Sequence, residues 1–226
     1  MKVFIYLSIV FCASALSLAA AEEPPMRHFS LSLLGLGHSP GDIVLLVGEE
    51  QFEIHSVPLN RISDAVEFST TMPLRVLLKG ADGRPGKQIA SLDIPETWQD
   101  VLIVITSSAG DVFYAYPMNY SEADVPQNSV VLINFTNAEM AAKIDDKVKQ
   151  VKPGLNSVES LGPIEGRRFI NLRIALQSEN DWNMLTSRRL AMLKDSRMLA
   201  FVHFFKDEQD IEGRWLLTPI RQGMSP

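Results

Sequence analysis

Four histidines are the side chains of this sequence best suited to bind a metal or to move a proton, and their spacing favours neither role. They are His28, His38, His55 and His203. None forms an H-x-x-x-H pair or a pair two residues apart on one strand, the arrangements that bring two ligands to one ion. His203, in "MLAFVHFFKD", alternates with apolar residues, which is typical of a buried strand histidine. The sequence therefore predicts no metal site and no cofactor.

Carboxylates are the next candidates for chemistry. The acidic segment "KDEQDIEG", residues 206–213, contains oxygen ligands that calcium accepts, but it lacks the D-x-[DN]-x-[DN]-G loop that directs several oxygens at one ion. We interpret this segment as a solvated hairpin end and "KGADGRPG" as a turn, and we assign neither a serine nucleophile nor a phosphate loop. Two distant carboxylates can still meet in a fold and act as acid and base, so a carboxylate-based hydrolase is an alternative. No catalytic residue is assigned.

Aromatic residues and possible glycosylation sites complete the candidates. The tryptophans Trp98, Trp182 and Trp215 would form a sugar-stacking platform if they were exposed together, and core packing is the alternative. Asn119 and Asn134 begin N-x-[ST] triplets, which are common by chance and matter only in a eukaryotic secretory pathway.

The N-terminus has the features of a secretory signal peptide. Lys2 precedes an apolar run through Leu18, and the small residues Ala19 and Ala21 fit a cleavage site after residue 21. An uncleaved membrane anchor is the alternative, because the run is nearly long enough to span a bilayer. The polar "EEPP" that follows favours cleavage. We expect an exported chain, periplasmic or extracellular, with no transmembrane segment after cleavage.

The position of the single cysteine bears on what stabilises the exported chain, and the distribution of its charges bears on which partners it can bind. The only cysteine, Cys12, lies inside the apolar run, so the mature chain has no disulfide and depends on its core. The whole chain has a formal net charge of −6, and its basic residues are scattered along the sequence, adjacent only at Arg167-Arg168 and Arg188-Arg189. Nucleic acid and anionic membranes call for a clustered positive field, so neither is an expected partner.

Short apolar runs separated by Gly, Pro, Asn and Asp recur about every ten residues, which predicts an all-β protein. The second half follows the plan of the first, because Leu74 aligns with Leu172, Val101 with Leu199 and Leu31 with Val130. The offsets are close to constant at about 100 residues. We predict two tandem antiparallel β-sandwich modules, immunoglobulin-like, after the signal peptide 1–21.

The predicted module boundaries follow from a polar, proline-containing stretch at residues 121–128. We place module 1 at residues 22–125 and module 2 at residues 126–226. The segments "IVLLV", "LRVLL" and "VLIVI" have apolar residues at both odd and even positions, so both faces of each strand are apolar. This indicates central strands or strands at the contact between modules.

The segment "NAEMAAKIDDKVKQVKPG", residues 137–154, fits two structures. Thr136 and Glu139 have the spacing of a capping box, and apolar residues recur at helical intervals, so local rules favour an amphipathic helix. The repeat instead aligns the segment with first-module residues that contain Gly41, Gly48 and a turn. We therefore predict a hairpin over residues 139–151 that turns at Asp145-Asp146.

The chain resembles a group of exported β-rich proteins of environmental Gram-negative bacteria whose activity is not established. The resembling stretches are "FSLSLLGLG", "LNRISDAVEF", "SVVLINFT", "VKPG" and the pattern W-x-x-L-x-S-R-R at Trp182 to Arg189. They are mostly strand and turn signals. The resemblance implies the fold and export and transfers no site residue.

These observations favour an exported, non-enzymatic binding or structural protein of the periplasm or cell surface, with a protein or glycan partner in the cell envelope. A carboxylate-based hydrolase is one alternative, and a deep cleft holding two acidic groups of raised pKa would favour it. A periplasmic chaperone-like two-domain protein is another, and a long exposed apolar edge strand would favour that.

Overall fold

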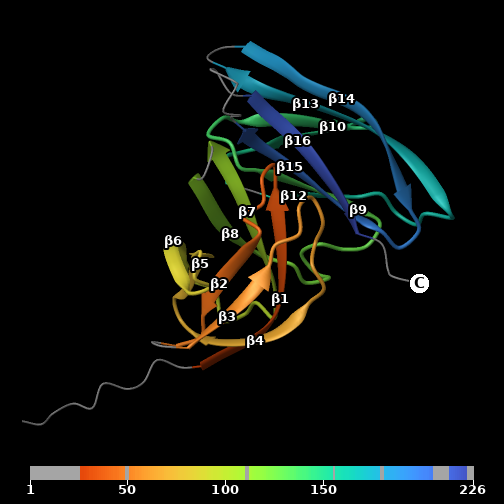
Figure 1. Cartoon of the computed structure of the whole chain (residues 1–226). Coiled ribbons are helices and arrows are strands. Elements are labelled where there is room, and N and C mark those ends of the chain that lie inside the picture. The colour runs from red at the N-terminus through yellow and green to blue at the C-terminus, as the bar shows by residue number, and fades with distance from the viewer. Residues whose placement is uncertain are drawn as a thin grey trace, which may run out of the picture.

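The computed structural model describes residues 26–48, 51–109, 112–154, 156–178, 181–205 and 214–222. These residues form sixteen β-strands in four four-stranded sheets and no helix (Figure 1). The chain is therefore all-β, as the spacing of its apolar runs predicts. The described residues contain no helix that is long and apolar enough to cross a membrane. The predicted signal peptide, residues 1–21, lies outside them.

The first module is a sandwich of two sheets. Its inner sheet has the strand order β4-β1-β7-β8, and its outer sheet has the order β3-β2-β5-β6. Neighbouring strands are antiparallel except β1 and β7, which pair in parallel. The strands are β1 (Met26–Leu36), β2 (Asp42–Leu46), β3 (Phe52–Ser56), β4 (Val66–Thr71), β5 (Leu74–Lys79), β6 (Pro85–Leu92), β7 (Asp100–Ala109) and β8 (Val112–Asn119).

The second module repeats this plan strand for strand. Its inner sheet has the order β12-β9-β15-β16 and its outer sheet the order β11-β10-β13-β14, so each strand corresponds to the one eight places earlier. The parallel pair recurs as β9 and β15. The strands are β9 (Ser129–Asn134), β10 (Met140–Ile144), β11 (Lys147–Val151), β12 (Asn156–Ser160), β13 (Arg167–Ser178), β14 (Asp181–Leu193), β15 (Arg197–Phe205) and β16 (Arg214–Gln222).

One anchor of the sequence alignment needs correction. Leu31 and Val130 both point into the core of their own module, as the alignment requires. Val101 also points into its own core, whereas Leu199 packs against the other module. The parallel registers place Val101 beside Leu31 and Met198 beside Val130, so Met198 is the equivalent of Val101. The predicted match was wrong by one residue because both strands are apolar on both faces.

The hairpin prediction for residues 139–151 is confirmed. Strand β10 pairs with β11 from Met140–Val151 to Ile144–Lys147, which leaves Asp145 and Asp146 in the turn. Asp145 has a φ of 51°, a left-handed conformation that aspartate tolerates better than most residues. The other edge of β10 pairs with β13. This pairing buries alternate side chains of β10 in the core, and that burial outweighs the local helix propensity.

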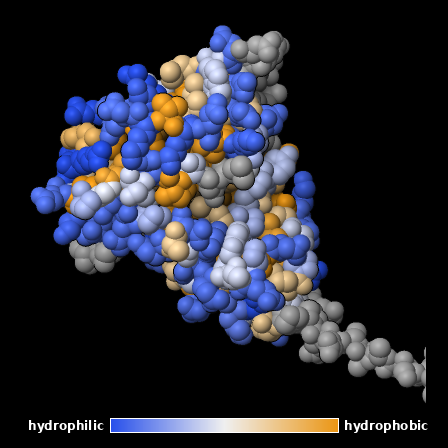
Figure 2. All heavy atoms as spheres, turned by 180° about the vertical axis from the view of Figure 1, so that it is seen from behind, coloured by the Kyte–Doolittle hydropathy of each residue, from blue (hydrophilic) through white to orange (hydrophobic). Residues whose placement is uncertain are grey.

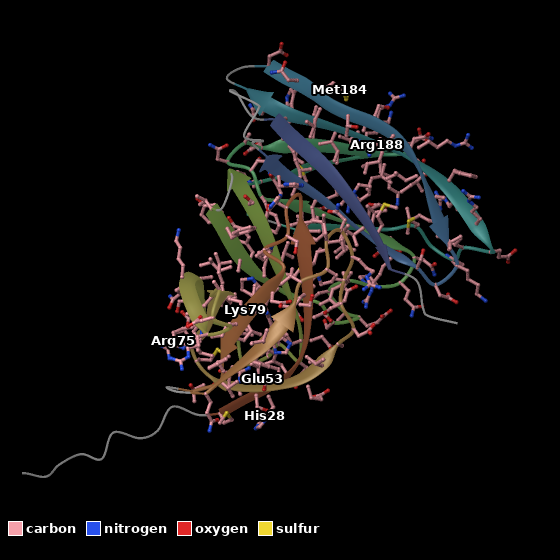
Figure 3. The ribbon with its side chains drawn as sticks, in the orientation of Figure 1. His28, Glu53, Arg75, Lys79, Met184 and Arg188 are labelled. Atoms are coloured by element: carbon pink, nitrogen blue, oxygen red, sulfur yellow. The ribbon has the colours of Figure 1, made fainter. Side chains whose placement is uncertain are left out.

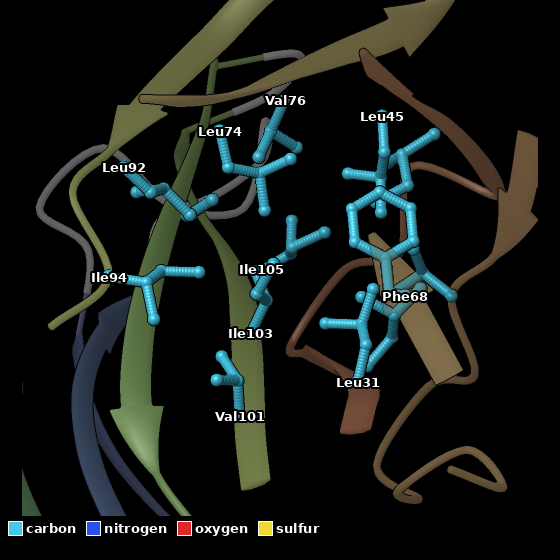
Figure 4. Packing of buried hydrophobic residues seen from close by; sticks show 14 of the residues in the cluster. Leu31, Leu45, Phe68, Leu74, Val76, Leu92, Ile94, Val101, Ile103 and Ile105 are labelled. Carbon is cyan, nitrogen blue, oxygen red and sulfur yellow. The ribbon is translucent and has the colours of Figure 1, made fainter. Parts of the chain in front are cut away.

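Each sandwich has its own core between its two sheets. In the first module, Leu45 of the outer sheet and Leu31, Phe68 and Ile103 of the inner sheet meet in this core (Figure 4). Phe29 and Phe68 pack with their ring centroids 5.7 Å apart. Such a core lets each module fold without a disulfide.

A third apolar cluster joins the two modules through their inner sheets. Strand β7 is buried on both faces: Ile103 points into the first core, whereas Leu102 and Val104 pack in the cluster that contains Phe201 of β15. The pattern of "VLIVI" predicts a central strand or a strand at the contact between modules, and β7 is both. The four sheets stack in the order outer, inner, inner, outer (Figure 1), which leaves the outer sheets at opposite ends of the molecule.

Residues 120–128 connect the modules and contain no strand. The predicted boundary between residues 125 and 126 falls in this segment. The guanidinium of Arg197 lies 4.2 Å from the ring centroid of Tyr120 and donates a 2.9 Å hydrogen bond to the carbonyl of Val125. Burial raises the pKa of Tyr120 to about 12. The connection is thus fixed to β15 of the second module.

Candidate functional site

The histidines lie apart and make separate contacts. His28 hydrogen-bonds Ser69 at 2.7 Å, and His55 contacts Glu53 at 3.0 Å. His203 is 1% exposed on β15. Within the described parts of the chain, no three side chains of His, Cys, Asp or Glu gather as metal ligands would.

The two described tryptophans and the triplet of Asn134 do not form the sites considered from the sequence. Trp98 packs against the first core, whereas Trp182 is 37% exposed on β14, so these two form no shared platform. The side chain of Trp215 lies outside the described part of the structure. Asn134 is fully buried, and its amide donates to the carbonyl of Val151 at 3.1 Å, which closes that triplet to a glycan in the folded protein.

Residues 37–41, "GHSPG", match the pattern G-x-S-x-G, a match that the sequence analysis missed. The nucleophile of this pattern needs a strand, a sharp turn and a helix, with a base beside the serine. Here the segment joins β1 to β2. The hydroxyl of Ser39 donates to the carbonyl of Val57 at 2.7 Å and accepts from the N–H of Gly41 at 3.1 Å. These contacts hold a turn, and they give the serine no base.

The described carboxyls with a shifted pKa are not suited to act as a general acid. The pKa of Asp42 is lowered by its hydrogen bond with Lys79, and that of Glu159 is lowered chiefly by its hydrogen bond with Lys147. A general acid working near neutral pH needs the opposite shift. The acidic segment 206–213 lies outside the described residues.

The charge of the outer sheet of the second module sets it apart. Its four strands, β10, β11, β13 and β14, contain eight Lys and Arg residues and one acidic residue, Asp181. The equivalent strands of the first module, β2, β3, β5 and β6, contain three basic and two acidic residues. Because the two sheets share one topology, the fold does not impose this excess of positive charge. The sequence-based view that the basic residues are scattered is wrong for this sheet.

Strand alternation places much of this charge on one face. Along β13, the odd-numbered residues from 167 to 173 are exposed, whereas the even-numbered residues from 170 to 176 are buried in the core. In the register of the sheet, Lys143 lies directly opposite Arg173, and Arg189 lies directly opposite Asn171. We define the basic face by its six outward residues, Lys143, Arg167, Phe169, Asn171, Arg173 and Arg189.

Two arginines of the basic face are held by one aromatic ring. The guanidinium carbons of Arg167 and Arg189 lie 4.6 and 4.5 Å from the ring centroid of Phe169, which is 44% exposed. Stacking of this kind orders a guanidinium and leaves its N–H groups available at the rim of the ring. The ring therefore presents two ordered arginine side chains to solvent.

Three of the four remaining basic residues of the sheet have structural partners, and the fourth is Arg188. Lys147 and Lys149 bind Glu159 of β12 at 2.5 and 3.0 Å, and Arg168 binds Asp145 at 3.0 Å. No described carboxylate lies within 4.0 Å of a charged nitrogen of the four cations on the basic face. Lys143 and Arg173 are like charges in direct opposition, which destabilises a sheet unless an anion lies between or above them.

No residue of the basic face lines a described cavity. The described cavities lie elsewhere: one of about 330 Å³ between the modules beside Tyr116 and Phe135, one of about 310 Å³ beside His55 and Arg61, and one of about 200 Å³ beside Glu159. On the side drawn in Figure 2, hydrophobic spheres stand in small groups among hydrophilic ones. A charged sheet face without a cavity can hold an extended partner but cannot enclose a small molecule.

In comparisons with known proteins, the chain matches no family model and no curated protein.

Proposed function

We propose that this chain is an exported, non-enzymatic binding protein of the periplasm or cell surface that holds an anionic partner on the basic face of its second module. The observation that carries the proposal is the direct opposition of Lys143 and Arg173 with no described carboxylate within 4.0 Å of their charged nitrogens. Two uncompensated like charges raise the free energy of the unliganded sheet. A bound anion would remove that cost, so the arrangement favours binding.

The repeat supplies an internal comparison. Arg75 of β5 aligns with Arg173, yet its guanidinium donates to the carbonyl of Gly48 at 3.4 Å. Its neighbour Lys79 binds Asp42 at 2.6 Å. In the first module, both cations of β5 are thus used for structure. Figure 3 shows Arg75 and Lys79 on the first module, far from Met184 and Arg188 on β14.

Charge distribution supports binding at one end of the molecule. Residues 26–120 contain six Lys and Arg against eleven Asp and Glu, so the first module is acidic. An anion would be repelled by this module and attracted by the outer sheet of the second.

The chaperone alternative depends on an edge strand open to another chain. Strand β14 is a thirteen-residue edge strand, which is long enough to pair with a peptide. However, its register shifts opposite Ile174 and Ala175, and it carries Arg188 and Arg189. Irregular pairing and charge are the features that keep an edge from adding a strand. The binding function is therefore better supported than strand addition.

The proposal is tested with dextran sulfate, a polyanion that requires no knowledge of the natural partner. We expect the parent chain to bind it and Arg173→Gln to bind about tenfold more weakly, the loss that follows removal of one charge-assisted contact. Arg75→Gln is the matched control because it removes the equivalent cation of the first module. Binding that is absent, or equally weakened by both substitutions, would contradict the proposal.

A further inference from the structure

The basic face is a narrow stripe. From Arg167 to Arg173, six residues of extended strand span about 20 Å. Across β10, β13 and β14, three strands span about 10 Å. No residue of this stripe lines a described cavity. A stripe of these proportions fits one extended polymer chain lying along β13.

Neutral hydrogen-bonding groups alternate with the charges. Ser187 lies directly opposite Arg173, and Asn171 lies directly opposite Arg189. Hydroxyl and amide side chains donate and accept hydrogen bonds, as sugar hydroxyls do. A partner that is charged at every position would bind the arginines but would offer no neutral group to form hydrogen bonds with Ser187 and Asn171.

The cations themselves favour a planar anion. Three of the four are arginines, whose guanidinium fork matches the two oxygens of a carboxylate. Phe169 orders two of these forks. A carboxylate-bearing chain would therefore meet donors that lose little conformational entropy on binding.

The same outward side continues beyond the charges into an apolar part. Met184 lies opposite Ala175, and Trp182 lies opposite Gln177, so both follow Arg173 along the direction of β13. They are 62% and 37% exposed. An indole ring beside a row of hydrogen-bonding groups is suited to stack on the C–H face of a sugar.

Other anionic partners fit this face less well. A lipid surface would need apolar side chains grouped for insertion, but on this outward side they are separated by charges: Val148 lies beyond Lys143 at one edge, and Met184 and Trp182 lie beyond Arg173 at the other. A densely charged phosphate polymer would have no hydroxyl groups to match the neutral side chains of Asn171 and Ser187. A second copy of this chain offers few carboxylates on any one described sheet: the most acidic, the inner sheet of the first module, carries Glu67 and Asp100 against Arg27.

We infer that the anionic partner of the basic face is an acidic polysaccharide, a carboxylate-bearing sugar chain that lies along β13 from Arg167 toward Trp182. This inference rests on the proposed function and names the class of its ligand. Carboxylates would bind the arginine forks, hydroxyls would bind Asn171 and Ser187, and a sugar ring would stack on the indole.

The probe is polygalacturonate, and its fully methyl-esterified form is the control because the backbone is the same and the carboxylates are masked. Titrations are made at about 150 mM salt, where exposed charges more than about 8 Å apart are largely screened. We expect esterification and Arg189→Gln each to weaken binding about tenfold. Arg188→Gln is expected to change it less than about twofold, because Arg188 pairs opposite the core residue Leu172 and leaves the strand on the other side.

The indole contact gives a second readout. We expect Trp182→Ala to weaken polygalacturonate binding about fivefold, in line with the contribution of one aromatic contact, and to leave unchanged the binding of polyglutamate, a carboxylate chain without sugar rings. Equal loss for both polymers would show that the tryptophan has only a structural role. Because Arg189 and Trp182 are exposed, both variants should keep the melting temperature of the parent.

Two competing partners complete the experiment. Phosphatidylglycerol vesicles and duplex DNA are titrated under the same conditions, and tighter binding to either would overturn the inference in favour of that partner. If dextran sulfate binds through Arg173 while polygalacturonate binds no better than its ester, the polysaccharide inference fails and the proposed function stands. If no polyanion binds, both fail.

Discussion

Replacing Glu159 with glutamine is expected to destabilise the second module, because this carboxylate joins its two sheets. Glu159 belongs to β12 of the inner sheet and is 6% exposed. It accepts hydrogen bonds from Lys147 and Lys149 of β11 in the outer sheet, at 2.5 and 3.0 Å. The substitution keeps the shape of the side chain and removes its charge.

The magnitude follows from the exposure of the two lysines. The Lys147 side chain is 69% exposed, so water screens this pair and it contributes about 0.5 kcal/mol. The Lys149 side chain is 30% exposed, and its charge-assisted hydrogen bond contributes about 1.5 kcal/mol. The expected loss is about 2 kcal/mol in the free energy of unfolding, which corresponds to a fall in Tm of about 4–8 °C for a chain of this size.

The lowered pKa of Glu159 determines how the difference in Tm between the parent and the variant changes with pH. The pKa of Glu159 lies below its ordinary value of 4.5, chiefly because of the hydrogen bond with Lys147 and against the effect of burial. A carboxylate whose pKa is lowered by folding stabilises the folded state above the unfolded pKa, and this stabilisation is lost as the pH falls through the folded pKa. The difference in Tm between the parent and Glu159→Gln should therefore be full at pH 7 and shrink below pH 4.5.

Circular dichroism melting curves of the parent and the variant, recorded at several pH values, measure this difference. Glu165→Gln is the control, because Glu165 is an exposed carboxylate of the same module without an ion pair to the described residues. A difference that stays the same from pH 7 down to pH 3, or that is also present in the control, would refute the reasoning.

Four further predictions concern the hairpin, the contact between modules, the absence of metals and export. Asp146→Pro should cost less than about 1.5 kcal/mol in urea unfolding, whereas Ile144→Pro, which is hydrogen-bonded in β10, should cost clearly more; equal losses would contradict the turn assignment. Phe201→Ala, at a fully buried position between the modules, should cost about 3–5 kcal/mol, and a cost below 1 kcal/mol would show that the modules are not coupled there. EDTA and reductants should each change Tm by less than about 5 °C, and a larger fall with EDTA would reveal a structural metal. N-terminal sequencing of the secreted protein should begin at Glu22, and finding Met1 would contradict cleavage.

Much of the fold was predictable from the sequence because its signals are local or repeat at a fixed interval. Branched and aromatic runs of five to ten residues between turn residues specify strands. The repeat then decided between helix and hairpin for residues 139–151, where local rules alone favour the helix. Parallel pairing of β1 with β7 was not predictable, because it depends on the crossover between the sheets.

The facing of fully buried strands was harder to predict. Along β7, both Ile103 and Val104 are fully buried, one in the core of the module and the other at the contact with the second module. When the residues at both odd and even positions of a strand are apolar, the sequence does not show which set faces the core of the module and which faces the other module. This is why the match of Val101 with Leu199 was wrong by one residue.

The basic face was not predictable, because it is assembled by register. Lys143 and Arg173 are thirty residues apart in sequence and become direct neighbours through the pairing of β10 with β13. Arg189 joins them from β14. One local signal was present, since "RRFINLR" places arginines at both ends of an alternating strand. Nothing in the sequence alone shows that carboxylates lie elsewhere.

The most direct test of the account is nuclear magnetic resonance mapping of bound polygalacturonate on the labelled protein. The account predicts that the amide and arginine side-chain signals that shift belong to the outward residues of β10, β13 and β14, with Arg173 and Arg189 foremost. Signals of the equivalent strands β2, β5 and β6 should stay in place. Shifts confined to the cavity beside Tyr116 and Phe135, or to the first module, would contradict the assignment of the basic face as the binding site.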